Sequence, residues 1–494
     1  PFSAETCLAS CSRTPVAPVR RMWQSGVEMT WGRAVAVSCL IGVIASSAYF
    51  AYHEPGALET SMEAEYGWTP AQLGLLFTAY SIPPFWMTVI AGALMSKCGL
   101  KMVGATLLAL IASGTLIGAL ASSSSALSGT GKLYVWMVGR FLVGAGGEAL
   151  VTWQQAACTI WFHGEHLGKA MATALSVQQV VGSALSFVVL PAFPELTHAV
   201  WAAVAFCTGC LACLGLYVLV ERAHQPYLDA RAAAGSHGDD IYEKLDDEDT
   251  PRTGTWAMVR AMPALFWAQN VLIFLDVTVL YSSANFFPDW LQEVYGMSVH
   301  DAGMCTSLIY WMVALAPLAG ALTDRYGYRL VVQTVASLAI GVVFLMLYLV
   351  PPNLLSPVIA LVLIGVLFSC IEYNAYCLLE VTWSSVPGDP EGIGFGIMGI
   401  ALNLGLVSLP ELTGVLATAT GTTRHQNLLF ALWMFAGAGV SLLERCLPGG
   451  QRLNNVAGVP ERVEHVVKSP VGTPCILNVQ WLEGLVANGE KFEL

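Results

Sequence analysis

The sequence predicts an all-α membrane protein with twelve transmembrane helices arranged as two halves of six. Of its 494 residues, 55% are hydrophobic and only 11% are charged, whereas a soluble chain carries roughly a quarter charged residues. The mean hydropathy is +0.62. Apolar runs long enough to cross a bilayer core, which takes about twenty residues, recur along the chain between short polar segments. We therefore expect a lipid bilayer around most of the chain.

The apolar runs define the predicted spans and an acidic segment divides them. The spans cover 33–53, 71–95, 102–121, 133–161, 168–191, 200–220, 262–287, 302–322, 330–350, 356–382, 392–416 and 428–445. The segment between the sixth and seventh contains 246-DDED-249, which predicts a solvated linker. The predicted organisation is a tail (1–32), a first half (33–220), a linker (221–261), a second half (262–445) and a second tail (446–494).

The distribution of basic residues predicts the orientation in the membrane. Basic residues concentrate on the cytoplasmic side of membrane proteins. If both termini are cytoplasmic, all 22 lysines and arginines lie on that side except Lys132, Arg424 and the intramembrane Arg140. The opposite segments are instead acidic, through Glu54, Glu59, Glu63, Glu65, Asp289, Glu293 and Asp301.

Charge and motif content exclude several functions. A net charge of −12 argues against nucleic acid as a partner, because nucleic-acid binding needs a basic surface. The histidines and acid of 163-HGEH-166 do not have the spacing of a zinc motif, so we expect no metal and no cofactor. Neither a nucleophile–base pair nor a dinucleotide fingerprint is evident, which argues against an enzyme.

The two halves share a local motif after their second spans. The first copy is 92-GALMSKCGLK-101 and the second is 320-GALTDRYGYR-329, the kind of self-similarity that marks an internal repeat. A carboxylate at the end of its own helix is unfavourable there and seeks another helix's N-terminus or an arginine. We predict a cytoplasmic latch between spans, formed by Gly320, Asp324, Arg325, Gly327 and Arg329. The first copy has Ser96 and Lys97 in place of the acid and arginine.

Six plus six spans, an acidic middle loop and the G-x-x-x-D-R-x-G-x-R motif resemble the major facilitator superfamily. Within it, 49-YFAYHEPGAL-58, 139-GRFLVGAGGEAL-150 and 402-LNLGL-406 look like the lysosomal dipeptide transporter branch. The resemblance implies a major facilitator fold, alternating access by rocking of the two halves, and movement of dipeptides or similar small zwitterionic solutes. It also implies a lysosomal or other acidic endomembrane, with the plasma membrane as the alternative, and a single-span glycosylated accessory membrane protein as a partner.

Ionisable residues inside the predicted spans are the candidate functional residues. A charge at the bilayer centre costs about 2.5 to 3.5 kcal/mol on insertion scales, so such residues face the bundle interior or water. The resemblance implies that Glu148, in the fourth span, contacts the amine of a peptide. Arg140 lies too far along the same helix to pair with Glu148, and we assign it a structural or gating role.

Other polar residues complete the predicted substrate site. The arginine that the resemblance would place in the fifth span is absent, and 175-LSVQQVVGS-183 offers Gln178 and Gln179 instead. The remaining candidates are Asp276, Tyr281 and Asn285 in the seventh span, Glu372 in the tenth and Asn403 in the eleventh.

The sequence leaves three functions open. The first is a carrier of dipeptides or similar zwitterions, either facilitative or proton-linked. The second is a proton-coupled carrier of another polar organic solute, which the absent arginine favours. The third is a membrane sensor or scaffold that moves no solute.

Overall fold

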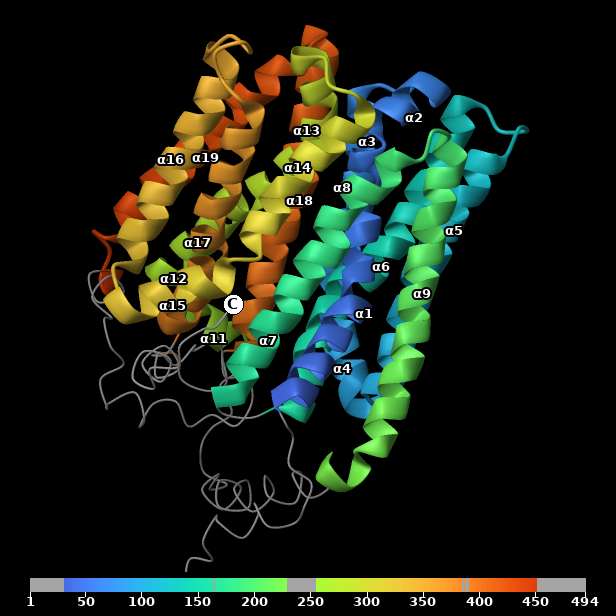
Figure 1. The fold of residues 1–494 in the computed structure, drawn as a ribbon. Helices are drawn as coiled ribbons and strands as arrows, with labels where there is room; N and C mark the ends of the chain where they lie inside the picture. The colour runs from blue at the N-terminus through green and yellow to red at the C-terminus, as the bar shows by residue number, and fades with distance from the viewer. Residues whose placement is uncertain (1–30, 163–164, 229–254, 384–385, 387–390, 451–494) are drawn as a thin grey trace, which may run out of the picture.

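The computed structural model describes residues 31–162, 165–228, 255–383, 386 and 391–450, and within them the regular elements are all helical. Ten helices in this part of the chain are long and apolar enough to cross a membrane. Figure 1 shows the long helices running side by side along a common direction. Most of the predicted linker and of both predicted tails lies outside the described residues.

The first six predicted spans each coincide with a helix or an interrupted helix. The short helix α2 (Glu59–Tyr66) stands between the first two. The six are α1 (Trp31–Ala57), α3 (Pro70–Ser81) with α4 (Pro84–Cys98), α5 (Leu100–Ser123), α6 (Gly129–Trp161), α7 (Glu165–Gln178) with η2 (Gln179–Ala184), α8 (Leu185–Val189) and η3 (Leu190–Ala192), and α9 (Leu196–Ala223).

The last six predicted spans also each coincide with a helix or an interrupted helix. A short helix, α11 (Thr255–Ala261), precedes them. They are α12 (Ala264–Leu272) with η4 (Ile273–Val277) and α13 (Thr278–Tyr295), α14 (Val299–Val313) with α15 (Ala316–Tyr326), α16 (Arg329–Leu349), α17 (Pro357–Trp383), α18 (Glu391–Thr420) and α19 (Arg424–Glu444).

Local sequence signals explain where the second span begins and breaks. Thr69 caps α3, because its hydroxyl accepts from Gln72 N at 3.3 Å while Gln72 Oε1 accepts from Thr69 N at 3.0 Å. The span is interrupted between α3 and α4, where Pro83 and Pro84 follow each other. Two consecutive prolines lack the amide hydrogens that would continue the helical ladder.

The end of the first span differs from the prediction. The predicted span ends at residue 53, but α1 continues through Ala57. Glu54 is 1% exposed and Glu59 is 3% exposed, although the sequence placed both in a polar segment between spans. The physical reason is packing: α2, which carries Glu59, and α1, which carries Glu54, both lie against α13 instead of leaving these side chains in water.

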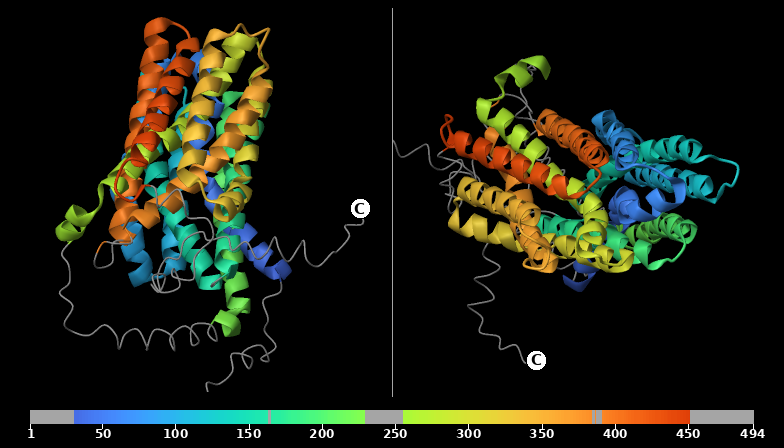
Figure 2. Two further views of the ribbon diagram at one scale, coloured as in Figure 1. Left: turned by 90° about the vertical axis from the view of Figure 1, so that its left-hand side faces the viewer. Right: turned by 90° about the horizontal axis from the view of Figure 1, so that it is seen from above.

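Figures 1 and 2 show the helices as two groups, α1–α9 and α12–α19, which we call the N-terminal and C-terminal halves. We call the end where α1 begins and α9 ends the linker side, and the opposite end, which carries α2, the far side. Contacts between the halves include α3 with α18, α1 with α13, and α14 with η2 and α8.

The α3–α18 contact holds the halves together on the far side. Ala71 N donates to Thr418 Oγ1 at 3.1 Å. Gly414 of α18 lies directly against the carbonyl oxygen of Pro70, so that any side chain there would separate the helices. The structure therefore represents a state in which the far side is closed.

Candidate functional site

Three polar side chains from both halves meet in the middle of the bundle. Gln179 Nε2 donates to Tyr281 Oη at 3.3 Å and to Glu372 Oε1 at 3.4 Å. Tyr281 Oη donates to the same Glu372 oxygen at 3.2 Å. Gln179 belongs to the N-terminal half, and the other two belong to α13 and α17 of the C-terminal half. We call these three residues the central cluster.

A π-helical segment carries Gln179 into the central cluster. The fifth span changes from α-helix to π-helix over Gln179–Ala184, a local irregularity that is frequent at functional sites. Gly182 within it lies against Ser46 O of α1, where a Cβ would come within 2.7 Å. Ser183 Oγ donates to Gln179 Oε1 at 3.0 Å and orients the amide.

Glu148 lies on α6 within the N-terminal half and contacts Tyr80 of α3. Tyr80 Oη donates to Glu148 Oε1 at 3.3 Å. Two neighbouring glycines allow this approach: Gly144 lies against the carbonyl oxygen of Tyr80, and a Cβ on Gly147 would come within 2.5 Å of the Tyr80 hydroxyl. The missing side chains therefore let α3 approach α6 closely.

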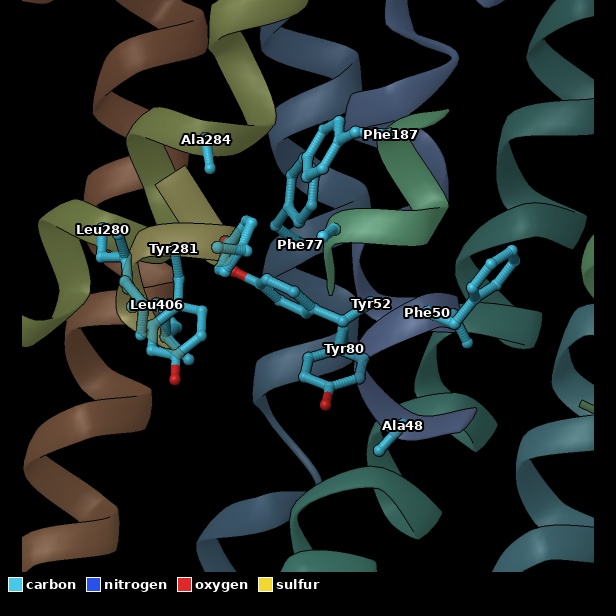
Figure 3. Packing of buried hydrophobic residues seen from close by; sticks show 14 of the residues in the cluster. Ala48, Phe50, Tyr52, Phe77, Tyr80, Phe187, Leu280, Tyr281, Ala284 and Leu406 are labelled. Carbon is cyan, nitrogen blue, oxygen red and sulfur yellow. The ribbon is translucent and has the colours of Figure 1, made fainter. Parts of the chain in front are cut away.

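A run of aromatic rings connects Glu148 to the central cluster. The centroids of Tyr80 and Tyr52 are 4.8 Å apart, and those of Tyr52 and Tyr281 are 6.3 Å apart. Figure 3 shows these three rings together with Phe77 and Phe187. Hydroxyl groups and ring faces thus extend from a carboxylate in one half to a carboxylate in the other, and ring faces attract cations.

Asn285 joins the halves closer to the far side through His53, a residue that the sequence alone did not single out. His53 Nδ1 lies 2.8 Å from Asn285 Oδ1, and Asn285 Nδ2 donates to Tyr281 O at 2.8 Å. This second bond fixes the amide, so Nδ1 is the donor. His53 is 0% exposed and its Nε2 has no partner within the described residues. In the neutral ring, Nε2 is a hydrogen-bond acceptor.

Arg140 is buried between backbone carbonyls of two other helices. Its guanidinium donates to Ala51 O, to Tyr52 O at 3.0 Å and to Leu76 O at 3.4 Å. Its Cζ also lies 5.0 Å from the ring centroid of Tyr80. The guanidinium is therefore occupied by α1 and α3, which it ties to α6.

Asp276 does not join the central cluster. It lies on the π-helical segment η4 and is 0% exposed. Its Oδ2 accepts from Ser337 Oγ of α16 at 2.7 Å, and its Oδ1 lies directly against Gly437 of α19. The carboxylate points into the C-terminal half, away from the interface at which Tyr281 meets Gln179.

Two further predicted residues, Gln178 and Asn403, are buried but form no hydrogen bond with the central cluster. Gln178 is 0% exposed, and neither end of its amide has a partner among the described residues. Asn403 is 2% exposed and donates only within its own helix, to Gly399 O at 2.9 Å.

The predicted latch lies at the linker-side turn between α15 and α16. Gly320 lies in α15, Gly327 ends that helix with a φ of 72°, and Arg329 begins α16. Gly99 ends α4 at the equivalent position of the first motif with a φ of 82°. Glycine supplies the positive φ that both turns need. Asp324 and Arg325 belong to α15, but their side chains lie outside the described part.

Across the described part of the chain, no group of three or more metal-ligating side chains converges. Hydrogen-bond donors, carboxylates and aromatic rings instead converge between two helical halves. This arrangement defines a polytopic membrane carrier of a small polar solute, because sites of this kind near the bilayer midplane lie at the interface of structural repeats.

The chain belongs to the Major Facilitator Superfamily, whose family model matches residues 39–410. Among curated proteins it is 25% identical to the mouse (Mus musculus) lysosomal dipeptide transporter MFSD1 over 423 residues, which are 83% of this chain and 84% of that protein. It is 23% identical to the human MFSD1 over 82% of this chain and 83% of that protein. It is also 23% identical to the probable sulfoacetate transporter SauU of Cupriavidus necator, over 82% and 92%.

Solved structures show the same fold. A D-xylose-proton symporter superposes with a TM-score of 0.62 at 13% identity, covering 84% of this chain and 98% of that one. The human organic anion transporter MFSD10 superposes with a TM-score of 0.53 at 17% identity, covering 84% and 100%. The predicted fold class and superfamily are confirmed.

Proposed function

We propose that this protein carries dipeptides or similar small zwitterionic solutes across a lysosome-like membrane by alternating access. The observation that carries the proposal is the central cluster, in which Gln179 of one half bonds Tyr281 and Glu372 of the other. A solute that displaced these bonds would bind both halves at once. Its binding would thereby be coupled to their relative movement, which is the requirement for alternating access.

The amine of the solute binds a carboxylate in this proposal. Glu148 and Glu372 are the two acids at either end of the aromatic run, and Tyr80 and Tyr281 already direct their hydroxyls at them. Charge-assisted hydrogen bonds from an ammonium group to a carboxylate are roughly twice as strong as neutral ones. The rings between the acids favour the same positive charge.

The solute's carboxylate meets weaker partners. Arg140 is occupied by three backbone carbonyls, so the donors that remain near the fifth span are amides such as Gln178. Within the described residues the site thus has two acids and no unoccupied guanidinium, which favours solutes that carry an additional positive charge. A dipeptide with a basic side chain, or a diamine, is therefore the second candidate substrate class.

The predicted cellular setting follows from the lysine and arginine distribution and from the names of the MFSD1 relatives. Both termini are cytoplasmic in this proposal, the far side faces the interior of an acidic organelle, and a single-span glycosylated membrane protein accompanies the carrier. Transport, and not catalysis, is the proposed activity.

Reconstitution in liposomes tests the proposal. Uptake of labelled dipeptides, a diamine and a dicarboxylate is measured at symmetric pH and with an inward proton gradient. We expect saturable uptake of dipeptides, strongest for those with a basic side chain, and its loss in Glu148→Gln and Glu372→Gln. The matched control is Glu65→Gln, since Glu65 is exposed on the far side. Preferential uptake of the dicarboxylate would contradict the assignment, and binding without flux would favour a sensor.

A requirement for the proton gradient separates the remaining alternatives. If uptake of the preferred solute persists at symmetric pH with equal initial rate, the carrier is facilitative. If the solute is concentrated only when the gradient is present, protons move with it. If that solute is not a dipeptide, the protein is the proton-coupled carrier of another polar solute that the sequence left open.

A further inference from the structure

The acidic far-side residues of the N-terminal half contact the C-terminal half directly. Thr60 of α2 donates to Asp289 Oδ1 of α13 at 3.3 Å, and Gln292 Nε2 of α13 donates to Thr60 Oγ1 at 2.8 Å. Glu59 and Glu63 lie beside Thr60 on the short helix α2, so the contact of Thr60 with Asp289 brings their carboxylates near enough to Asp289 for charge repulsion. Closure of the far side thus brings carboxylates of opposite halves together.

Glu59 is buried in this contact without compensation. It is 3% exposed, and neither of its carboxylate oxygens has a hydrogen-bond partner among the described residues. Glu63 is half-buried and its Oε1 also has none. An ionised carboxylate buried without a partner is very unfavourable, and such a group binds a proton instead.

The other charged groups around α2 do not neutralise these acids. Glu293 of α13 is held within its own half, accepting from Thr422 Oγ1 at 2.6 Å and from Thr423 N at 2.7 Å. Lys132 of α6 donates to Ser122 O at 3.2 Å and lies 4.5 Å from the ring centroid of Tyr66. Other ionisable groups on α2 and the elements beside it include Glu65, which is exposed, Tyr66 of α2, and His53 and Glu54 of α1, while α3 carries no charged residue.

We propose that Glu59, Glu63 and Asp289 form a proton-operated far-side latch, distinct from the predicted latch at the turn between α15 and α16. The far-side latch closes the far side when the three residues are protonated and releases it when they are ionised. Glu59 and Glu63 move with the N-terminal half and Asp289 with the C-terminal half. Ionisation therefore places repelling charges on opposite sides of the closing surface. Protonation removes the repulsion and leaves the Thr60 hydrogen bonds to hold the halves together.

The electrostatics give the direction of the pH effect. Burial, and then the nearby Asp289 and Glu63, raise the pKa of Glu59 well above its usual range. Burial and Asp289 raise the pKa of Glu63 to about 7. A group with a raised pKa in the closed state stabilises that state fully below its ordinary pKa, about 4.3 for Glu. The stabilisation is lost as the pH rises through the raised value, so closure weakens as the pH approaches and exceeds 7.

The latch is tested by measuring the far-side distance between the halves in the absence of any solute. Spin labels on non-native amino acids at Ser125 and Asn353, which are exposed far-side loop positions, leave the native cysteines unchanged. In nanodiscs we expect the population at the short distance, relative to that at the long distance, to fall by at least about tenfold between pH 5 and pH 8, because each unit of pKa difference between the two states contributes a factor of ten.

Variants test whether the change in distance comes from the far-side latch. Glu59→Gln combined with Glu63→Gln should hold the short distance at both pH values, whereas Glu65→Gln, on the same helix but exposed, should respond as the unaltered protein does. Asp289→Asn changes the far-side latch in the C-terminal half and should also weaken the response of the distance to pH. This variant provides the test if the double variant does not fold. A pH-independent distance in the unaltered protein, or a full response in the double variant, would overturn the proposal. Since no solute is added, this result is independent of the substrate class proposed above.

Discussion

Gln179, in the π-helical segment of the fifth span, donates a hydrogen bond to the hydroxyl of Tyr281 in the seventh span, 3.3 Å away, and so connects the two halves of the bundle. The fifth span is where the resemblance to the dipeptide branch led us to expect an arginine. A neutral amide in this span can bridge to Tyr281 and Glu372 without forming a buried ion pair. The site can therefore exchange this amide for a solute at low cost, because an amide is less costly than a charge to bury and release.

Removing the Tyr281 hydroxyl tests the bridge. Tyr281→Phe removes a hydroxyl that the solute binds when it displaces the bonds to Gln179 and Glu372. We therefore expect the KM for the transported solute to rise about tenfold, as for the loss of roughly 1.4 kcal/mol of binding. Uptake kinetics in liposomes measure it. Tyr310→Phe is the matched control, since the hydroxyl of this buried tyrosine has no partner among the described residues. An equal KM in both variants would contradict a role for the bridge.

The close approach of α3 to α6 depends on Gly144. A methyl group there would collide with the carbonyl oxygen of Tyr80, so Gly144→Ala must separate the helices that carry Tyr80 and Glu148. We expect a loss of about 1 to 3 kcal/mol of stability, typical of overpacking, measured as a lower unfolding temperature in detergent. Gly209→Ala is the control, because a Cβ on Gly209 of α9 meets nothing within 4 Å. If both variants unfold at the same temperature, the packing argument fails.

Arg140 is predicted to stabilise the N-terminal half. Arg140→Gln removes the guanidinium donor from the carbonyls of Ala51, Tyr52 and Leu76, and a buried group left unsatisfied costs about 1 to 3 kcal/mol. We expect a large fall in unfolding temperature together with loss of uptake. Arg424→Gln removes similar bonds, to Tyr348 O at 3.0 and 2.8 Å, but from an exposed position. It should change little, and a comparable fall in both variants would argue against burial as the cause.

The sequence predicted the helices well because a bilayer imposes a length and a composition that can be read from the chain. It did not predict the π-helical segments at Gln179–Ala184 and Ile273–Val277. Those depend on the packing of neighbouring helices and leave no mark in hydropathy. The extent of the first span was underestimated for a similar reason: Glu54 and Glu59 are polar, and only the packing of α1 and α2 against α13 buries them.

The sequence also could not predict which residues of the site contact one another. Gln179 and Glu372 are separated by 193 residues, and no spacing rule connects positions on helices from different halves. The partners of Arg140 are backbone carbonyls, which every residue possesses. His53 stands in the 49-YFAYHEPGAL-58 motif, but its neighbours on α13 give it a role, and these are known only from the fold.

Asp276 illustrates the limit most clearly, because its residue type and depth predicted a substrate contact. The fold instead directs its carboxylate at Ser337 and Gly437 within the C-terminal half. We accordingly expect Asp276→Asn to lower the unfolding temperature while leaving the KM unchanged within about twofold, the reverse of the effect expected for Tyr281→Phe. Unfolding in detergent and uptake in liposomes are compared on the same preparations. A KM increase near tenfold without loss of stability would show that Asp276 contacts the substrate after all.

The contact between Asp276 and Gly437 can be isolated by combining substitutions. Gly437→Ala places a methyl group against the Asp276 carboxylate, and overpacking of this kind costs about 1 to 3 kcal/mol. Gly439→Ala, two residues further along α19 with nothing within 4 Å of its Cβ, should cost much less. In an Asp276→Ala background the carboxylate is gone, so Gly437→Ala should become nearly neutral, and the coupling energy should lie between about 0.5 and 3 kcal/mol. Strictly additive costs would show that the two residues do not touch in the folded protein.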